Sequence, residues 1–211
     1  MKLLELFSGT GSVGKVFKER GWDVVSLDRD MDADIKTDIM DWDYKAAYEP
    51  GSFDVLWTSP PCTEYSAAKT VGVRQIAYAN SVVQRTLDII EYFQPRYWFL
   101  EHPQTGMLKG QPMMQDKPYT DVDYCRYGMP YRKRTRIWNN LEDWTPQPLC
   151  KRDFESMMEN KKRHKHIAQR CTVGENLDGR QCFRRDELYR IPAPLVEDIE
   201  QALRICLADS H

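Results

Sequence analysis

The amino-acid sequence predicts an α/β protein with a doubly wound, mostly parallel sheet. Strand-sized apolar segments alternate with helical patterns through the first two-thirds of the chain, a glycine-rich turn follows the first segment, and chemically distinctive side chains follow several others. Strands separated by helices pair in parallel and are covered on both faces. The residues that follow these strands therefore gather at one edge of the sheet, where open α/β proteins bind their ligands.

The individual elements are predicted from apolar periodicity and from residues that begin or end helices. The clearest helix covers 78–93, where Val83, Leu87 and Ile90 recur at helical spacing. Gly21 ends the first helix. The remaining elements are strands at 3–7, 23–28, 35–39, 53–58, 97–101, 121–126 and 134–141, a helix at 12–20, and a closing helix that begins at Pro192.

The composition is that of an ordinary globular protein. Of the 211 residues, 41% are hydrophobic and 29% are charged. No apolar stretch is long enough to span a membrane, and Glu5 interrupts what would have to be the apolar core of a signal peptide. The six cysteines include no Cys-x-x-Cys pair, so we expect reduced thiols in an intracellular protein, in the cytoplasm or, in a eukaryotic host, the nucleus.

Positive charge is concentrated in one segment. The net charge of the chain is −2, yet residues 126–190 hold 16 Lys and Arg against 9 Asp and Glu. Periodicity fades after Trp144, where Pro, Lys, Arg and Gly accumulate, so we expect 139–190 to form a small, irregular region. The charge pattern favours either a surface that binds a polyanion or an ordinary solvated surface.

The first candidate site is a glycine turn. Gly9-Thr10-Gly11 opens a G-x-G-x-x-G pattern between a strand and a helix, and Asp28 ends the next strand about 20 residues on. Glycines let the backbone approach a nucleotide-like ligand, and the carboxylate can accept from ribose hydroxyls. The pattern suits NAD, FAD and S-adenosylmethionine alike, and a tight turn without a ligand is the structural alternative. Asp38 can accept from an adenine amino group or serve as an ordinary turn residue.

The second candidate site follows the strand at 53–58. Pro60 and Pro61 fix the backbone and remove two donors, which gives a stiff ledge that presents the Cys62 thiol at the carboxyl edge of the sheet. A thiol in that place can act as a nucleophile, whereas a lone cysteine is more often a small core residue. The polar residues 63–76 resemble a mobile flap.

Three charged side chains complete the candidate site. Glu101 ends a strand of large apolar residues at the same edge, where a carboxylate needs solvent or a partner. His102 is expected in the loop that follows. Arg134 and Arg136 alternate along a predicted strand, so both can face one anion, although a basic strand is usually just an exposed one.

A metal site is not expected. The candidate ligands follow one another at spacings that match no familiar zinc pattern, so packed or solvated side chains are the simpler interpretation. These candidates are Cys150, His164, His166, Cys171 and Cys182.

The ordered set of motifs resembles the C5-cytosine DNA methyltransferases. The family's Phe-x-Gly-x-Gly turn is matched by Phe7 to Gly11, and its Pro-Cys motif by Pro61-Cys62. The family's Glu-Asn-Val motif is matched only at Glu101, because His102 and Pro103 replace the other two residues.

The resemblance continues toward the end of the chain. Arg134 and Arg136 match the family's Gln-x-Arg-x-Arg strand, with Arg132 in the place of glutamine. The segment from Ile191 to Leu195 is similar to the last motif of the family but lacks its Gly-Asn pair. The likeness covers about residues 3–138 and 190–207, and the small size suits a viral or bacterial-type member.

The resemblance implies a fold of the S-adenosylmethionine-dependent methyltransferase (Rossmann-like) type and a covalent mechanism. Cys62 would attack C6 of a flipped-out cytosine, Glu101 would hold N3 and the exocyclic amine, and C5 would take the methyl group. Arg134 and Arg136 would steady the base and the nearby phosphate. The implied contacts to S-adenosylmethionine are Phe7, Ser8, Gly9, Thr10, Gly11, Asp28 on the ribose, Arg29, Asp38 on the adenine, Ile39 and Pro60.

The resemblance also implies an organisation and a partner. Residues 1–138 would be the catalytic and cofactor-binding domain, 139–190 a small target-recognition region, and 191–211 a closing helix packed back on the catalytic domain. Longer family members place a sizeable recognition domain where this chain has about 50 residues. We expect a protein that binds double-stranded DNA and no membrane, as a monomer or, alternatively, a dimer. The side chains expected to hold phosphates are Lys161, Lys162, Arg163, Lys165, Arg184 and Arg185.

Two other functional classes remain open from the sequence. A nicotinamide-dependent oxidoreductase would explain the glycine turn and Asp28, but not the Pro-Pro-Cys ledge or the basic strand. A non-catalytic nucleic-acid-binding relative would keep the basic segment and lose the nucleophile, which is present here. Within the methyltransferase interpretation, RNA cytosine is the alternative substrate, because the motifs describe the base and not the sugar.

Overall fold

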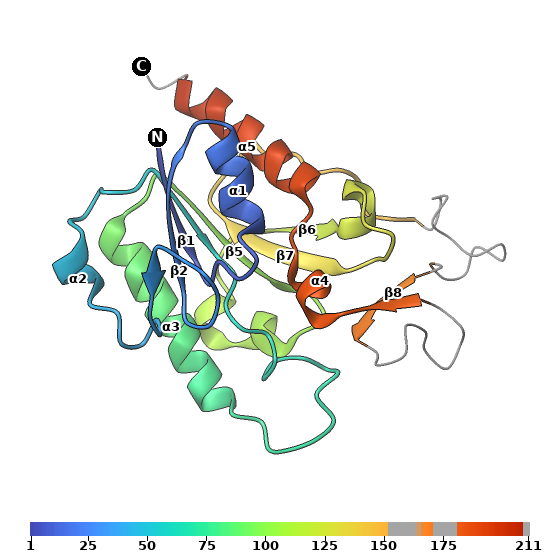
Figure 1. The fold of residues 1–211 in the computed structure, drawn as a ribbon. Coiled ribbons are helices and arrows are strands. Elements are labelled where there is room, and N and C mark those ends of the chain that lie inside the picture. The colour runs from blue at the N-terminus through green and yellow to red at the C-terminus, as the bar shows by residue number, and fades with distance from the viewer. Residues whose placement is uncertain (152–163, 165, 171–180, 209–211) are drawn as a thin grey trace. The chain divides into compact units, whose positions relative to one another are not determined.

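The computed structural model describes residues 1–151, 164, 166–170 and 181–208 (Figure 1). Two compact units divide the chain. The first unit comprises Met1–Thr120 and Arg136–Glu142, and the second comprises Asp121–Thr135 and Asp143–His211. These units reflect how compactly the chain packs and not what its parts do. The predicted functional boundaries at residues 138 and 190 therefore stay a prediction.

Strands and helices alternate along the chain, as the sequence predicts. In the described part, seven strands form one sheet in the order β3-β2-β1-β4-β5-β7-β6, and β8 pairs with β9. The strands are β1 Lys2–Leu6, β2 Asp23–Asp28, β3 Ile35–Lys36, β4 Val55–Thr58, β5 Tyr97–Pro103, β6 Tyr119–Asp123, β7 Arg134–Asn139, β8 His166–Arg170 and β9 Gln181–Phe183. The helices are α1 Ser12–Glu19, α2 Tyr44–Ala47, α3 Ile76–Phe93, α4 Arg185–Tyr189 and α5 Ala193–Ala208, with 3-10 turns η1 Met107–Gly110, η2 Pro112–Met114 and η3 Tyr124–Tyr127.

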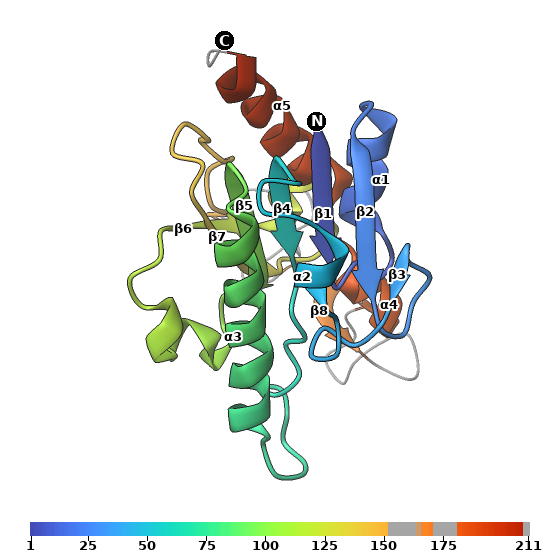
Figure 2. The same cartoon turned by 90° about the vertical axis from the view of Figure 1, so that its left-hand side faces the viewer.

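The sheet of the first unit carries helices on both faces. β1 pairs in parallel with β2 and β4, and β4 pairs in parallel with β5. Leu4 and Leu6 of β1 pack in the cluster that includes α3, whereas Glu5 points to the opposite face and meets Gly14 of α1. Figure 2 shows α3 in front of these strands and α1 on the other side. The doubly wound, Rossmann-like α/β fold predicted from the sequence is confirmed.

Aromatic side chains dominate the core under α3. Trp42, Tyr44, Phe53 and Phe93 are buried together, and the rings of Phe53 and Phe93 meet edge to face with centroids 5.1 Å apart. Each large side chain of this kind contributes about 1.5–3 kcal/mol on full burial. This packing holds the strands in position, and it therefore also positions the edge of the sheet at which their carboxyl ends lie.

Several element boundaries differ from the expectation. β3 is only two residues long, and the short helix α2 was not predicted because four residues give no readable periodicity. β5 continues to Pro103, so placing His102 in a loop is wrong: its side chain is 1% exposed within the strand. The sequence stops looking strand-like at Glu101 because a charged and a titratable side chain follow the apolar run.

The second unit has its own buried contacts. Trp144 Nε1 donates to Asp198 of α5 at 3.1 Å, and the ring of Tyr131 lies 4.8 Å from that of Phe183. The predicted closing helix is confirmed as α5, with Leu195, Val196, Ile199 and Leu203 buried along one stripe. Residues 139–190 were expected to be irregular, yet they contain β8, β9 and α4. In the part of the chain that the structure describes, no helix has the length and apolar character needed to cross a membrane.

Candidate active site

Strand register brings four of the predicted segments to one edge of the sheet. Leu6 lies opposite both Leu27 and Thr58, and Thr58 lies opposite Leu100. The residues that follow these positions are Phe7 after β1, Asp28 at the end of β2, Ser59 after β4 and Glu101 within β5. Because parallel strands end at the same edge, the glycine turn, the Pro-Pro-Cys ledge and Glu101 share the carboxyl edge.

The glycine turn adopts the conformation that its residues permit. Gly9 and Gly11 have φ of 53° and 66°, which an L side chain rarely adopts, and Gly11 is the N-cap of α1. Phe7, which does carry a side chain, also has a positive φ, of 56°. Such backbone conformations are costly and concentrate at functional sites. The Gly11 N–H donates to the Ser8 carbonyl at 2.8 Å, which closes the turn.

Asp28 organises this edge through three backbone donors. Oδ2 accepts from the Gly9 N–H at 2.8 Å, and Oδ1 accepts from the N–H groups of Asp30 and Met31 at 2.8 and 2.9 Å. The carboxylate therefore ties the glycine turn to the loop after β2. The sequence predicted a ribose acceptor at Asp28 but not this role in positioning the turn.

The next three predicted cofactor residues divide between surface and core. Arg29 donates through Nη1 to Oδ2 of Asp38 at 3.2 Å, and Asp38 Oδ1 accepts from the Met40 N–H at 2.9 Å. The side chain of Ile39 is buried in the core under α3. Arg29 is thus exposed and paired with a partly buried Asp38, while the side chain of Ile39 packs inside.

Cys62 follows the two prolines after β4. Its side chain is half-buried, its thiol is reduced, and its carbonyl accepts from the Tyr65 N–H at 3.2 Å. The predicted flap that follows is held together from within. Arg74 donates to the carbonyls of Glu64 and Ser66 at 2.8 Å each, and Lys69 Nζ pairs with the Glu64 carboxylate at 2.6 Å.

Glu101 and His102 are consecutive residues of β5, and both are buried. The imidazole of His102 meets the ring of Tyr65 edge to face at 5.3 Å, and the Tyr65 hydroxyl donates to Oδ1 of Asn80 at 2.7 Å. A Cβ at Gly106 would lie 2.9 Å from His102 Cε1, so the loop after β5 can approach only with glycine there. His102 thus links β5 to the loop that carries Cys62, a packing role that the sequence did not reveal.

The two arginines of β7 make different contacts. Arg134 donates from Nε and Nη2 to the two oxygens of Asp123 at 3.0 and 2.7 Å, within the second unit. Arg136 lies over the Tyr119 ring with 3.5 Å between guanidinium carbon and ring centroid, within the first unit. Both occupy the less buried positions of the strand, as their alternation predicts. The anion that Arg134 meets here is a buried carboxylate of the protein itself.

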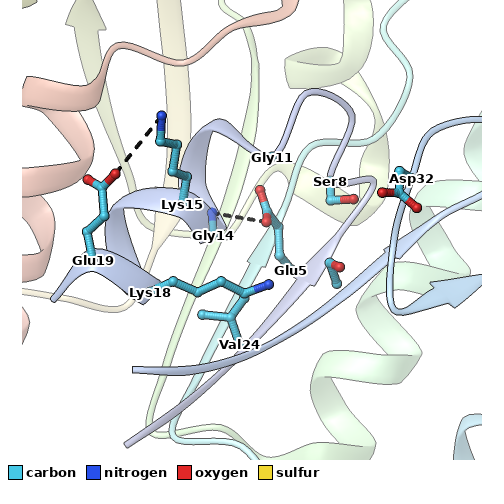
Figure 3. Close-up of a pocket in the computed structure, with 10 residues that line it drawn as sticks. Glu5, Ser8, Gly11, Gly14, Lys15, Lys18, Glu19, Val24 and Asp32 are labelled. Atoms are coloured by element: carbon cyan, nitrogen blue, oxygen red, sulfur yellow. Dashed lines mark hydrogen bonds and ion pairs between the residues drawn. The ribbon is translucent and has the colours of Figure 1, made fainter. Parts of the chain in front are cut away.

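A cavity of about 270 Å³ opens beside the glycine turn, between α1 and β2 (Figure 3). Ser8 and Gly11 line it, whereas Cys62 and Glu101 do not. Glu5, also in the lining, accepts from the Gly14 N–H at 3.0 Å, and a Cβ at Gly14 would collide with the Glu5 carboxylate. Burial raises the pKa of Glu5 to about 7, against the opposing effect of the backbone donors of α1. No sequence pattern singles out Glu5, because only the fold brings it to Gly14.

Two buried hydroxyls at this edge fit a bound cofactor. Oγ of Ser8 and Oγ1 of Thr58 are buried and have no hydrogen-bond partner among the described residues. A buried hydroxyl without a partner costs about 1–3 kcal/mol, so such groups normally await a ligand or a water. Thr58 ends β4 opposite Leu6 of β1, and Ser8 follows β1 next to Gly9, in the turn whose glycines leave room for a nucleotide-like group.

The fold and the chemistry of this edge define a class of protein. A doubly wound parallel sheet with a glycine turn and a Pro-Cys ledge at its carboxyl edge has the Rossmann-like architecture of methyltransferases. No family model matches the chain. A frog virus 3 protein described as a probable DNA (cytosine-5)-methyltransferase is 32% identical over 216 residues, which cover 94% of this chain and 98% of that protein. The chain belongs to the DNA (cytosine-5)-methyltransferase family.

Two solved structures are similar to this chain. A putative DNA modification methyltransferase encoded within an E. coli prophage matches 71% of this chain with a TM-score of 0.52 at 15% identity, which supports the fold. The Dnmt2 methyltransferase of S. pombe matches 66% of the chain with a TM-score of 0.43 at 16% identity. The chain spans about half the length of each of these two proteins, 52% and 50%.

Proposed function

We propose that this protein transfers a methyl group from S-adenosylmethionine to C5 of a flipped-out cytosine in double-stranded DNA. The observation that carries the proposal is the pairing of Thr58 with Leu100, which sets the segments of Cys62 and Glu101 at the ends of neighbouring strands. The glycine turn follows the strand on the other side of β4. The nucleophile Cys62, the acid Glu101 and the glycine turn thus belong to three adjacent strands. This arrangement suits transfer of a methyl group from the cofactor to the base.

The proposed cofactor contacts come from residues at the carboxyl edge of the sheet. The turn from Phe7 to Gly11 gives backbone access, the Ser8 hydroxyl supplies a buried polar contact, and Asp28 supplies carboxylate oxygens for the ribose. Arg29 and Asp38 would contact the adenine. Ile39 and Pro60 would contribute apolar contacts to the cofactor. When bound, S-adenosylmethionine supplies an electrophilic methyl group.

The protein activates the cytosine in two steps. The thiolate of Cys62 adds to C6, while Glu101 holds N3 and the exocyclic amine and donates the proton that N3 takes up. The electron pair displaced from the C5–C6 double bond makes C5 nucleophilic toward the methyl group. Loss of the C5 proton to water then restores the C5–C6 double bond as the C6–sulfur bond breaks. Cys62 leaves as the thiolate, and N3 returns its proton to Glu101.

Access to the base requires a change in the DNA. A cytosine inside a duplex is shielded, so it must rotate out at a cost of about a few kcal/mol. The segment 63–76 would close over it, with Arg74 preserving the shape of that segment as it moves. Arg136 and Arg134 would face the base and its phosphate, Arg134 only where its pairing with Asp123 leaves donors available.

The alternatives have less support. A nicotinamide-dependent oxidoreductase would use the glycine turn and Asp28 but leaves Cys62 and Glu101 without a role. A non-catalytic relative would not need them either. RNA cytosine offers the same base, so substrate choice is part of the test.

The test is transfer of label from tritiated S-adenosylmethionine to DNA and RNA duplexes of matched sequence, with Cys62→Ser as the inactive variant. DNA should be labelled by the wild-type protein and by the control Cys206→Ser, which removes a second thiol that is also half-buried in the described part of the chain. DNA that contains 5-fluorocytosine should trap the wild-type protein covalently, because fluorine cannot leave as a proton does. Labelling by Cys62→Ser at the wild-type rate would contradict the covalent mechanism, and label in RNA alone would contradict the DNA substrate.

A further inference from the structure

Three buried metal-ligand side chains meet in the second unit. Cys125, Cys150 and His164 are 1%, 7% and 8% exposed, and their ligand atoms all lie within 4.8 Å of one another. The Sγ of Cys150 is 3.7 Å from Nε2 of His164. None of the three has a role in the proposed methyl transfer. The sequence analysis named Cys150 and His164 among candidate ligands but preferred packed or solvated side chains, and it did not include Cys125, which lies in a distant part of the chain.

The surrounding structure positions these side chains. Cys125 lies in η3, directly after β6. The Cys150 N–H donates to Oδ2 of Asp123 at 3.0 Å, and Asp123 is itself held by the bidentate pair with Arg134. The backbone at Cys150 is therefore fixed against the end of β6, which brings the two sulfurs together.

The spacing suits a tetrahedral ion. Zinc binds sulfur at about 2.3 Å and imidazole nitrogen at about 2.0–2.1 Å, so two such ligands of one tetrahedral ion lie about 3.6 Å apart. The Cys150–His164 separation of 3.7 Å is close to this value. Soft thiolates combined with imidazole select zinc over the hard cations that prefer oxygen ligands.

The chemistry of the cluster suits a soft metal ion. Two buried thiols and one imidazole lie with their ligand atoms within 4.8 Å of one another, so three soft ligands are available to one ion. Thiolates rather than thiols bind zinc, so binding of the ion would displace the thiol protons.

We propose that Cys125, Cys150 and His164 bind a structural zinc ion, with a further ligand or water in the fourth position. The ion would join the end of β6 to two points of the chain that lie 14 residues apart in sequence, Cys150 and His164. This segment is rich in Lys and Arg and poor in apolar residues, and small regions of that kind are commonly stabilised by a metal instead of a core. The proposal is independent of the methyl-transfer chemistry.

The experiment measures metal in the purified full-length chain. Expression with zinc in the medium and mass-spectrometric metal analysis should give about one zinc per chain, the stoichiometry of a single tetrahedral site. Cys150→Ser and His164→Asn should lose most of that zinc, whereas the control Cys206→Ser should retain it. Replacement of zinc by cobalt should produce the absorption of thiolate-to-cobalt charge transfer, and chelation should lower the melting temperature by about 5 °C or more, reversibly on adding zinc.

Wild-type protein that contains no zinc and gives no cobalt–thiolate absorption would overturn the proposal. So would a Cys125–Cys150 disulfide, detected as a loss of two hydrogens by intact-mass analysis before reduction. If the variants fail to fold, the zinc content and the cobalt spectrum of the wild-type protein decide the matter by themselves. None of these readouts depends on methyl transfer, so failure here and failure of the proposed function are separate results.

Discussion

Asp28 accepts a hydrogen bond from the backbone N–H of Gly9, with 2.8 Å between Oδ2 and the nitrogen. This bond joins the end of β2 to the glycine turn after β1. The same carboxylate receives the N–H groups of Asp30 and Met31. Asp28 is thus both the proposed ribose acceptor and a structural tie between the two loops that would enclose the cofactor.

Asp28→Ala should therefore weaken S-adenosylmethionine binding by about 1–3 kcal/mol, because the partly buried Gly9 N–H loses its acceptor and the proposed ribose contact is lost. Asp28→Asn should lose less, because the amide oxygen can still accept from Gly9. Isothermal titration calorimetry measures both. Asp23→Ala, at the opposite end of the same strand, is the matched control and should bind normally. Equal affinity in a folded Asp28→Ala protein would place the ribose contact elsewhere.

Glu5→Gln should make the protein relatively more stable as the pH rises. Burial raises the pKa of Glu5 from its ordinary value of 4.5 to about 7, so the folded state holds a proton that the unfolded state releases. The cost of this group is absent below pH 4.5, grows as pH rises toward 7, and reaches about 3 kcal/mol above that. The glutamine variant avoids it and still accepts from Gly14.

Urea unfolding of both proteins at pH 5 and at pH 8, without cofactor, tests this prediction. The stability advantage of Glu5→Gln over wild type should be larger at pH 8. Glu91→Gln changes an exposed carboxylate on α3 and should show no such dependence. An advantage of equal size at the two pH values would show that Glu5 ionises normally in the folded protein.

The sequence predicted the sheet because buried strands and glycine turns leave local signals. Leu3, Leu4 and Leu6 give β1 a largely apolar sequence, and Gly9 and Gly11 have positive φ angles that L side chains rarely adopt. Family membership also confirms the function class inferred from the motifs. Which side chains touch the cofactor and the base stays a prediction.

What the sequence did not reveal depends on contacts between distant residues. Glu5 meets Gly14 only because α1 packs across β1, and Cys125 joins Cys150 only because Asp123 holds the Cys150 backbone. β8 and β9 were missed because Lys, Arg and Gly surround them and obscure their alternation. The phosphate-binding side chains expected at Lys161, Lys162, Arg163 and Lys165 lie outside the described residues, and so does Cys171.

Arg134→Ala should destabilise the fold because it leaves the buried Asp123 carboxylate without its partner. Asp123 is fully buried, and Arg134 supplies two of its hydrogen bonds. Breaking a buried pair at one end costs about 3–5 kcal/mol, and we expect about 2–3 kcal/mol here because Arg132 lies 4.0 Å away and Arg134 is partly exposed. Denaturant unfolding gives the value.

Two further variants separate stability from DNA binding. Asp123→Asn added to Arg134→Ala should recover part of the lost free energy of unfolding, since it removes the unpaired buried charge. Arg136→Ala removes the stacking on Tyr119 and the longer contact with the Trp138 ring but leaves the buried Asp123 paired, so it should cost about 1 kcal/mol while weakening DNA binding. If Arg134→Ala is as stable as wild type, the Asp123 carboxylate is satisfied without it.

The last prediction concerns how much DNA sequence the protein reads. Residues 139–190 number only about 50, and several of them are used in β8, β9 and α4. So small a region presents few side chains to base edges, while its Lys and Arg residues suit phosphates. Phosphate contacts position the protein without reading sequence, whereas each good bidentate base contact adds about 1–3 kcal/mol of discrimination.

We therefore expect a recognition site of about two to four base pairs, with DNA affinity that falls steeply as salt rises. Bisulfite sequencing of a random DNA library after methylation gives the site directly. Replacing Lys161 and Lys162 by alanine should reduce the salt dependence of binding by about one unit of slope for each phosphate that the variant no longer binds, without changing the preferred sequence. A preferred site of about six or more fixed base pairs would mean that bases are read by more side chains than this region can offer. In that case a second subunit or a distortion of the DNA would have to contribute to recognition.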